Sequence, residues 1–257
     1  MYHTTGFSKT AIVDICARIV EFFPVRKRVT GRKPALGLFR SVVVTLAYLR
    51  RNHVQQELAD FFDASQSTIS RTIATFVQIL KVVFTQGVPS VEDLDPETQY
   101  IIDGTLLPCW SWRALPELYS GKHHTTGVNV QVACTLTGEL AWISDPLPGS
   151  VHDAKAIRES GLLDTPSTDE NPPSHLGDKG YIGLGMITPK RKPIHRPLVE
   201  QEKDFNRQVN QIRYQIERTI ANLKTWRILH TDYRRPYTTF SDTIAAVIGL
   251  EFHRQTF

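Results

Sequence analysis

The sequence predicts a chain of two structural classes: an all-α N-terminal part followed by an α/β domain with a mixed sheet. Two observations predict this division. In the first part, apolar residues recur at helical spacing, which is typical of amphipathic helices. Beyond residue 98, segments with period-two alternation are interleaved with helical patterns, in the order strand, strand pair, helix, strand, helix. That order is typical of an α/β domain.

The N-terminal part begins with a helix predicted for residues 10–23 and ended by Pro24. Its apolar face consists of Ile12, Ile15, Ile19 and Phe22. A basic stretch follows, with Arg26-Lys27-Arg28 and Arg32-Lys33-Pro34. Residues 1–34 are therefore predicted to be an N-terminal helix and a basic connector that touches phosphates.

A helix-turn-helix domain is predicted for residues 35–95. Its three helices cover about residues 35–51, 54–62 and 66–81, with Asp63-Ala64 as the turn between the last two. Leu58 and Ala59 are expected to pack inward, and the small Ala59 lets the third helix cross closely. Residues 85–98 have the Gly and Pro content of a linker.

The third of these helices is the candidate for reading DNA. Ser65 or Ser67 can cap it, and Ile69 and Ile73 are expected to face the core. Its first turns display side chains that can bond base edges or phosphates: Gln66, Ser67, Thr68, Ser70 and Arg71. The motif resembles the helix-turn-helix of bacterial transposases and repressors. A purely structural three-helix bundle is the alternative, but the nearby arginines favour DNA binding.

The α/β domain is predicted to cover residues 96–257. Strands are expected at residues 99–103, 128–134, 140–143 and 174–176, and helices at residues 151–160, 200–229 and 240–253. The long helix 200–229 has an apolar stripe formed by Phe205, Val209, Ile212, Ile216, Ile220 and Leu223.

Charge divides the chain into three parts. Lys and Arg outnumber Asp and Glu by 12 to 5 in residues 1–82 and by 13 to 7 in residues 190–257, whereas residues 83–189 hold 5 basic and 14 acidic residues. Two basic ends around an acidic middle indicate two surfaces for a polyanion and a carboxylate-rich site. The longest apolar run, Ser41–Leu49, is too short to span a bilayer. We therefore expect a cytoplasmic, nucleoid-associated protein with no membrane partner.

Three carboxylates form the candidate catalytic site. Asp103 is expected at the end of an apolar strand, Asp178 lies between glycines, and Glu217 lies at the edge of the stripe on the long helix. Each alone has an ordinary explanation, as a turn aspartate or as a surface ion pair with Arg213. Phosphodiester cleavage, however, uses two divalent ions about 4 Å apart that are held by carboxylates from separate elements. The three together predict a site for two Mg²⁺ (or Mn²⁺) ions.

The order of the motifs resembles that of the DDE superfamily transposases, specifically the insertion-sequence group related to Harbinger-type elements. The resemblance covers nearly the whole chain and rests on Ile101-Ile-Asp103-Gly-Thr, Pro148-Gly-Ser-Val-His-Asp153, Leu176-Gly-Asp178-Lys-Gly-Tyr181 and Ile216-Glu217-Arg ending in Leu223-Lys224. It implies an RNase H-like fold with Asp103, Asp178 and Glu217 as the catalytic, metal-binding triad.

Basic residues beside the triad are candidates for holding the DNA phosphates: Lys179, Arg213 and Lys224. Related families place a Tyr, an Arg, a Glu and a Lys on the last helix. Arg213, Glu217 and Lys224 match this pattern, but Asn210 stands at the tyrosine position. The difference concerns the presumed DNA contact of that tyrosine and leaves the metal ligands unchanged.

Asp153 competes with Asp178 for the role of second metal ligand. Asp153 lies at the start of the predicted helix 151–160, where a carboxylate can bond free N–H groups. This is a sufficient structural role, whereas no convincing helix follows Asp178. We therefore expect Asp178 to bind metal, with its carboxylate roughly 4–6 Å from those of Asp103 and Glu217. Asp153 is expected to order the rim of the site.

These observations predict a transposase that binds the terminal inverted repeats of its element. It is expected to cleave double-stranded DNA at the element ends with a metal-activated water and to join the free 3′ hydroxyl to a target site, as a homodimer in the active complex. Two alternatives remain: a domesticated DDE nuclease that cuts without transposing, and a DNA-binding regulator whose C-terminal part is an oligomerisation module. Dependence of strand cleavage on a divalent metal separates the regulator from the two enzymes.

Overall fold

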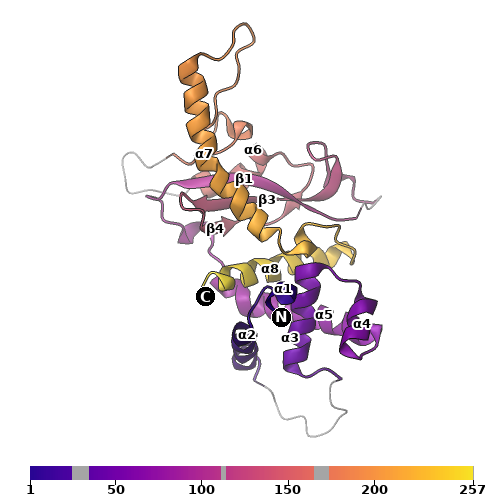
Figure 1. The fold of residues 1–257 in the computed structure, drawn as a ribbon. Helices are drawn as coiled ribbons and strands as arrows, with labels where there is room; N and C mark the ends of the chain where they lie inside the picture. The colour runs from indigo at the N-terminus through magenta and orange to yellow at the C-terminus, as the bar shows by residue number, and fades with distance from the viewer. Residues whose placement is uncertain (25–34, 111–113, 165–173, 257) are drawn as a thin grey trace. The chain divides into compact units, whose positions relative to one another are not determined.

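The structure, a computed structural model, describes residues 1–24, 35–110, 114–164 and 174–256 (Figure 1). The chain divides into two compact units, Met1–Val88 with Thr225–Phe257, and Pro89–Lys224. The expected basic connector at 25–34 lies outside the described residues. The sequence grouped residues 225–257 with the α/β domain, whereas by contacts they belong to the unit of N-terminal helices. The predicted division into functional domains at residues 34/35 and 95/96 stays a prediction.

The first unit is entirely helical. Its α-helices are α1 (Tyr2–Thr5), α2 (Lys9–Phe22), α3 (Leu38–Arg51), α4 (Gln55–Phe62), α5 (Gln66–Phe84) and α8 (Phe240–Arg254), and its 3₁₀ turns are η1 (Thr85–Gly87), η6 (Arg227–Leu229) and η7 (Tyr237–Thr239). The predicted helices are thus present, with ends shifted by a few residues. Phe22 departs from the prediction: as the last residue of α2 it is 40% exposed, while Ile12, Ile15 and Ile19 are buried.

Helix α8 joins this unit because its apolar face packs on α5. A side chain on Gly249 would lie 2.8 Å from Cβ of Phe84, so only glycine permits this close approach. The buried Trp226 donates from Nε1 to Oε2 of Glu251 at 2.8 Å, and Lys81 on α5 pairs with Asp242 on α8 at 2.6 Å. Burial of the C-terminal segment, and not its position in the sequence, therefore decides which unit it completes.

One stretch of the described chain, Gln66–Asp93, is long and apolar enough to cross a membrane by length and composition alone. A single stretch of this kind is weak evidence for a membrane span. It contains α5, whose buried residues are Ile69, Ile73, Val77, Leu80 and Phe84. In its own unit α5 contacts α3, α4 and α8.

The second unit is built on a five-stranded sheet. Its strands are β1 (Tyr100–Pro108), β2 (Tyr119–Ser120), β3 (Thr125–Thr135), β4 (Leu140–Ile143) and β5 (Leu147–Pro148). The long strand β3 pairs antiparallel with all four others. The expected strand at 174–176 is reduced to Leu176, which makes parallel bridges to Ile101 and Ile187. These parallel bridges give the otherwise antiparallel sheet its mixed character.

Helices cover this sheet from two sides: α6 (Asp153–Glu159) and α7 (Glu200–Leu223) both contact β3, and α7 also contacts β1. Short 3₁₀ turns lie in the connections: η2 (Val91–Asp93), η3 (Pro116–Leu118), η4 (Leu162–Asp164) and η5 (Lys179–Tyr181). Ile102 of β1, Ile157 of α6 and Tyr181 share one buried core. Figure 1 shows α7 crossing β1 and β3 and continuing well beyond the sheet at its N-terminal end.

Candidate active site

Asp103 lies in the middle of β1, not at its end. The strand was expected to stop at Asp103, but it continues to Pro108 because residues 104–108 stay in register with β3. Successive residues of a strand face opposite sides of a sheet. Ile102 faces the core that includes α6, and Asp103 faces α7, where its Oδ2 pairs with Nη2 of Arg213 at 3.2 Å.

The environment of Asp103 makes its charge costly. Its side chain is only 18% exposed. Burial raises the pKa of this carboxyl to about 6; Arg213 opposes the rise, and the nearby charge of Asp178 adds to it. Asp103 and Asp178 are thus close enough to repel each other, as two carboxylates that share a cation site would be.

Asp178 follows the bridged Leu176 and begins the 3₁₀ turn η5. Its Oδ1 accepts a hydrogen bond of 2.6 Å from the backbone N–H of Gly180. Gly177 is required here, because a side chain on it would lie 2.7 to 2.8 Å from Met186 and Tyr181. Among the described residues, Oδ2 of Asp178 has no protein donor, so it is available to another ligand.

Tyr181 ties this loop to the sheet. Its hydroxyl donates to Oε1 of Gln131 at 2.6 Å inside the core. Gln131 in turn donates from Nε2 to Asn129 at 3.0 Å and, more weakly, to Asp153 at 3.4 Å. Burial raises the pKa of Tyr181 far above its usual value, and the nearby carboxylates add to the rise. The hydroxyl therefore stays protonated and remains a donor.

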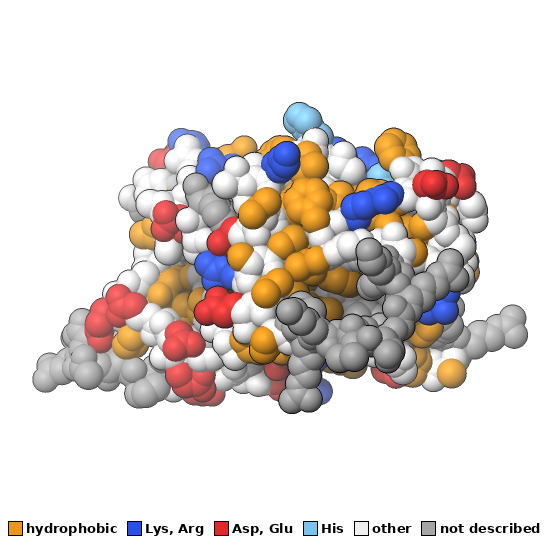
Figure 2. All heavy atoms as spheres, turned by 90° about the horizontal axis from the view of Figure 1, so that it is seen from below, with side chains coloured by type: hydrophobic (Ala, Val, Ile, Leu, Met, Phe, Trp, Pro, Cys, Tyr) orange, Lys and Arg blue, Asp and Glu red, His pale blue; other side chains and the backbone are white. Residues whose placement is uncertain are grey.

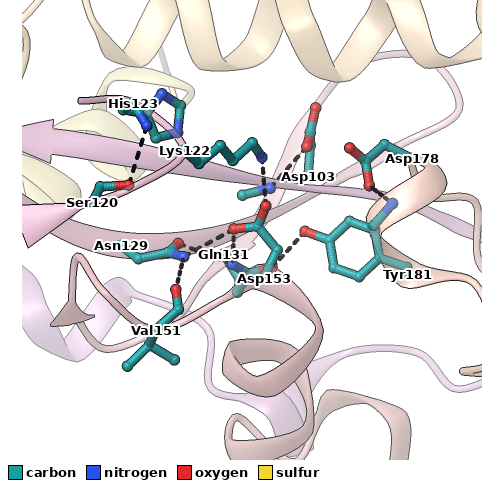
Figure 3. A network of polar contacts seen from close by, with 12 residues as sticks. Asp103, Ser120, Lys122, His123, Asn129, Gln131, Val151, Asp153, Asp178 and Tyr181 are labelled. Carbon is teal, nitrogen blue, oxygen red and sulfur yellow. Dashed lines mark hydrogen bonds and ion pairs between the residues drawn. The ribbon is translucent and has the colours of Figure 1, made fainter. Parts of the chain in front are cut away.

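Asp153 lies on the opposite side of β1 from Asp103 (Figure 3). Its Oδ2 accepts a hydrogen bond of 2.6 Å from Nζ of Lys122, and its Oδ1 accepts one of 2.9 Å from Nδ2 of Asn129. A side chain on Gly104 would lie 2.3 Å from Oδ1 of Asp153, so glycine makes room for this carboxylate against the strand. Burial alone would raise the pKa of Asp153, but the bonds from Lys122, Asn129 and Gln131 hold it below its usual value.

The structural roles expected for the two aspartates are exchanged. Asp178, expected to have no helix behind it, caps η5. Asp153, expected to bond the N–H groups of α6, instead accepts hydrogen bonds from side chains of Lys122, Asn129 and Gln131. That argument for preferring Asp178 as metal ligand is therefore wrong. A different one supports the same choice: both oxygens of Asp153 are occupied by protein donors, and Asp153 lies away from the α7 side of β1.

Sequence reasoning missed Lys122, Asn129, Gln131 and Tyr181 as parts of this network. A signal for two of them was present, because Asn129 and Gln131 are polar side chains at alternate positions of an otherwise apolar strand. Positions i and i+2 of a strand face the same side of the sheet. Their common face predicts that a polar group lies against them, but not that the group is Asp153.

Two of the expected site residues, Arg213 and Glu217, lie on α7, and the third, Lys224, caps its C-terminal end. Arg213 reaches Asp103, whereas Glu217 is exposed. Lys224, directly after α7, is partly buried, and this burial lowers its pKa. Burial and Lys122 lower the pKa of His123, Asp153 opposes this effect, and the positive charge of Lys224 adds to the lowering. Lys179 is exposed beside Asp178.

Within residues 1–24, 35–110, 114–164 and 174–256, no three Asp, Glu, His or Cys side chains are grouped closely enough to hold an ion. The triad of Asp103, Asp178 and Glu217 therefore remains a prediction. The donor chemistry fits a hard divalent cation, because Asp103 and Asp178 are both carboxylates and the charge of Asp178 adds to the raised pKa of the largely buried Asp103. A divalent cation between Asp103 and Asp178 would offset both their repulsion and the cost of burying Asp103.

The candidate DNA-reading helix α5 has the predicted geometry. Ser65 is its N-cap and accepts from the N–H of Thr68 at 3.2 Å, while Ile69 and Ile73 are fully buried. Leu58 and Ala59 of α4 are buried as expected. The turn between α4 and α5 passes through Asp63, whose φ is +49°. The predicted contact residues are exposed or half-buried: Gln66, Ser67, Thr68, Ser70 and Arg71.

Arg71 is held along the helix surface. It donates from Nε to the carbonyl of Ser67 at 3.1 Å and from Nη2 to the hydroxyl of Ser67 at 3.4 Å. Gln66 donates to Gln55 of α4 at 3.1 Å, which links the two helices of the motif. Beside this helix lies an open hollow of about 930 Å³, bounded by residues of α5 and by the start of α3 with the residues just before it. Arg71 is one of its lining residues, so a bound polyanion would meet its guanidinium.

Comparison with known proteins gives two family matches. A model described as DDE superfamily endonuclease matches residues 102–250, and a model described as helix-turn-helix of DDE superfamily endonuclease matches residues 34–86. A curated protein of Microchaete diplosiphon, described as a probable transposase for insertion sequence element IS702, is 25% identical over 248 residues, which is 88% of this chain and 85% of that protein.

A second relative, from Streptomyces albus G, bears the description "Putative transposase for insertion sequence element IS112". It is 28% identical over 201 residues, covering 77% of this chain and 73% of its own length. No solved structure matches the chain. The catalytic-domain match contains Asp103, Asp178 and Glu217, and the other match contains the whole of α4 and α5. The chain belongs to the DDE superfamily endonucleases and carries their helix-turn-helix region ahead of the catalytic domain.

Proposed function

We propose that the protein is the transposase of an insertion sequence. It binds the terminal inverted repeats of its element through α5, cleaves the DNA strands at the element ends and joins the free 3′ hydroxyl to a target site. One observation carries this proposal: the chain combines a helix-turn-helix with a largely buried strand carboxylate, Asp103, which lies near Asp178 and pairs with Arg213 of α7. Both curated relatives are described as transposases of insertion sequences.

In this proposal Asp103, Asp178 and Glu217 supply the oxygen ligands for two Mg²⁺ or Mn²⁺ ions. When bound, such ions lower the pKa of a water and stabilise the attacking and leaving oxygens of an in-line displacement. Arg213, which now pairs with Asp103, is positioned to donate to the scissile phosphate. Lys179 and Lys224 hold neighbouring phosphates of the same strand. Binding of DNA and metal is therefore coupled through Arg213.

The network behind β1 positions the site without touching the DNA. Asp153 fixes Lys122, and Gln131 connects Asp153 to Tyr181, three residues after Asp178. The hydrogen bonds from Lys122 to Asp153, from Gln131 to Asp153 and from Tyr181 to Gln131 each join two different segments of the polypeptide. The network therefore keeps the Asp178 loop at a set position against β1, which is what a shared cation site requires.

A cleavage assay tests the proposal. Purified protein is incubated with a labelled duplex that carries the inverted repeat flanking its gene, with Mg²⁺, with Mn²⁺ or with EDTA. Metal-dependent nicking at the repeat boundary supports the proposal, and joining of the cut end to a second duplex separates a transposase from a nuclease that only cuts. Equal DNA binding in metal and EDTA, with no cleavage in either, would identify a DNA-binding regulator instead.

The active complex is proposed to be a homodimer, since two element ends have to be brought together. Exposed apolar side chains are available for association: on α2 these include Val13, Val20 and Phe22. Figure 2 shows hydrophobic side chains gathered near the middle of one face, among charged ones. Sedimentation with and without element-end DNA tests this point. The proposed place of action is the nucleoid of the cytoplasm, where the DNA substrate lies.

A further inference from the structure

A second basic element, unrelated to the helix-turn-helix, precedes α7. Residues 189–199, called here the basic arm, run Pro-Lys-Arg-Lys-Pro-Ile-His-Arg-Pro-Leu-Val and contain no acidic residue. The arm leads into α7 at the end that extends beyond the sheet (Figure 1). Its middle forms a turn at Ile194 and His195. The active site described above uses none of these residues.

Specific bonds to α7 fix the shape of the basic arm. The backbone N–H of Lys190 donates to Oδ1 of Asn206 at 2.7 Å, and Nδ2 of Asn206 donates back to the carbonyl of Lys190 at 3.1 Å. Arg196 makes a two-point ion pair with Glu202, at 2.7 and 2.9 Å. Glu202 also accepts from the N–H of Val199 at 3.0 Å. The arm is therefore tied to α7 on both sides of its turn.

The charges left on the basic arm are not neutralised by the protein. Lys190, Arg191 and Lys192 are all exposed, and no carboxylate in the described part of the chain forms an ion pair with them. The acidic residues at the start of α7 already have partners: Glu200 pairs with Lys203, Glu202 with Arg196 and Asp204 with Arg207. Lys190 lies over the ring of Phe205, 5.6 Å from its centroid, and Lys192 is exposed without a protein partner of this kind among the described residues. The arm thus keeps three adjacent positive charges that form no ion pair in the described chain, as a polyanion-binding surface does.

An exposed apolar side chain lies at the turn of the basic arm, close in sequence to the three cations. Ile194 is 93% exposed, the most exposed large hydrophobic residue of the described chain. It lies at the turn, directly after Pro193, on a backbone that the anchors to α7 hold in place. Cationic side chains around an exposed, branched apolar residue are typical of protein elements that enter the minor groove of DNA.

The first cationic residues of the basic arm, Lys190 and Arg191, lie near the active site. Nη2 of Arg191 donates to the carbonyl of Lys179 at 3.0 Å, and Lys179 directly follows Asp178. Along α7 at about 1.5 Å per residue, the anchor Asn206 lies ~16 Å from Glu217 and the helix start lies ~26 Å from it. Because duplex DNA rises about 3.4 Å per base pair, these lengths correspond to roughly five to eight base pairs.

We propose that the basic arm binds the minor groove of the DNA that flanks the cleavage site, roughly five to eight base pairs from the scissile phosphate. Lys190, Arg191 and Lys192 contact backbone phosphates, and Ile194 enters the groove. The inference rests on the proposed function, since it assigns a second contact surface to the same DNA. It adds a contact near the cut that does not depend on the sequence read by α5.

Binding measurements test the charge of the arm. Full-length protein carrying Asp103→Asn, which leaves the DNA uncut, is titrated against the element-end duplex at several salt concentrations. Lys192→Gln is expected to weaken binding about fivefold and to reduce the slope of log K against log salt by about 1. Ile194→Ser is expected to weaken binding at every salt concentration with an unchanged slope. Lys155→Gln, which removes an exposed lysine of α6, is the matched control and should change neither quantity.

Position is tested by cross-linking. Ile194→Cys, labelled with a photoreactive group, is expected to cross-link to DNA about five to eight base pairs from the cleavage position. The parent protein, which lacks the Ile194→Cys change and is treated with the same label, gives the background from Cys16. Cross-linking to a second protein copy in place of DNA would overturn the proposal, as would Lys192→Gln and Ile194→Ser binding like Lys155→Gln.

These outcomes separate the two proposals. If wild-type protein cleaves the element end with Mg²⁺ while the arm variants bind and cross-link like the controls, the arm assignment fails and the transposase assignment stands. If wild-type protein neither binds nor cleaves the element end, both fail together. Melting temperatures of the arm variants equal to that of wild type show that weaker binding does not come from unfolding.

Discussion

The polar residues of α5 and those around Asp103 are arranged in opposite ways. On α5 the candidate contact residues are exposed or half-buried, and their bonds are local: Ser65 to Thr68, and Arg71 to Ser67. Around Asp103 the side chains are buried, and their partners lie far along the sequence: Arg213 is 110 residues from Asp103, and Tyr181 is 50 residues from Gln131. A change on α5 should therefore alter one contact with DNA, whereas a change near Asp103 should disturb several segments at once.

The largest effect is expected from the three carboxylates. Asp103→Ala, Asp178→Ala and Glu217→Ala should each abolish Mg²⁺-dependent cleavage, because two ions cannot be held with one ligand missing. Specific DNA binding should survive, because α5 belongs to the other unit. Parallel cleavage and gel-shift assays measure the two properties. A variant that still cuts at the wild-type rate removes its residue from the triad, and Asp153→Ala then becomes the next variant to examine.

The packing of β1 against Asp153 is tested by Gly104→Ala. The added methyl would lie 2.3 Å from Oδ1 of Asp153 and 2.8 Å from Nε2 of Gln131, so the network has to shift. We expect a loss of about 1–3 kcal/mol in the free energy of unfolding, measured in urea, together with slower cleavage. Gly121→Ala, which meets nothing within 4 Å, is the control. Equal stability of the two variants would contradict the role assigned to Gly104.

The local character of the α5 contacts is tested by Arg71→Ala. Loss of a base contact should cost about 1–3 kcal/mol of binding free energy and relax specificity at one position. Loss of a phosphate contact should weaken binding to all sequences and flatten the salt dependence. Arg18→Ala, which removes an exposed arginine of α2, serves as the control. Unchanged affinity across a salt titration would remove this part of α5 from the interface.

A smaller effect is expected from Tyr181→Phe. It leaves Oε1 of the buried Gln131 without its donor, which should cost about 1–2 kcal/mol of unfolding free energy. The same change at the exposed Tyr214 should cost almost nothing. Because the hydroxyl of Tyr181 stays protonated, the cost should not vary between pH 6 and pH 9. A cost that changed over this range would show that Tyr181 titrates.

The smallest expected effect concerns pH. Nδ1 of His175 accepts from the N–H of Tyr100 at 3.3 Å, and burial lowers the pKa of His175 below its usual 6.5. Between the folded pKa and 6.5 the unfolded chain binds more protons. The contribution of His175 to stability is therefore complete above pH 6.5 and declines as the pH falls towards the folded pKa. The free energy of unfolding in urea, measured at pH 7.5 and at pH 5.5, should fall less between these two values for His175→Gln than for wild type.

The helical unit shows how much local pattern predicts. Apolar spacing placed α3, α4 and α5, and Ser65 was identified as a possible cap because few residue types satisfy free N–H groups. Phe22 was misplaced because a helix face near its end is not constrained by packing. The assignment of α8 to the α/β domain followed sequence order, whereas Gly249 and Trp226 fit α8 against α5 and η6.

The sequence by itself determined the helical and α/β character of the two parts, the apolar faces and the motifs that carry Asp103, Asp178 and Glu217. These follow from residue type and from periods of two and 3.6, which act over a few positions. The tertiary structure decided that β1 continues past Asp103, that Asp178 caps a turn and that Asp153 is held by Lys122, Asn129 and Gln131 on the other side of the strand. The side-chain contacts of Asp153 and the contact of Asp103 with Arg213 join residues 22 to 110 positions apart. No local pattern encodes which distant side chain will lie against a given face, because burial of the whole unit selects it.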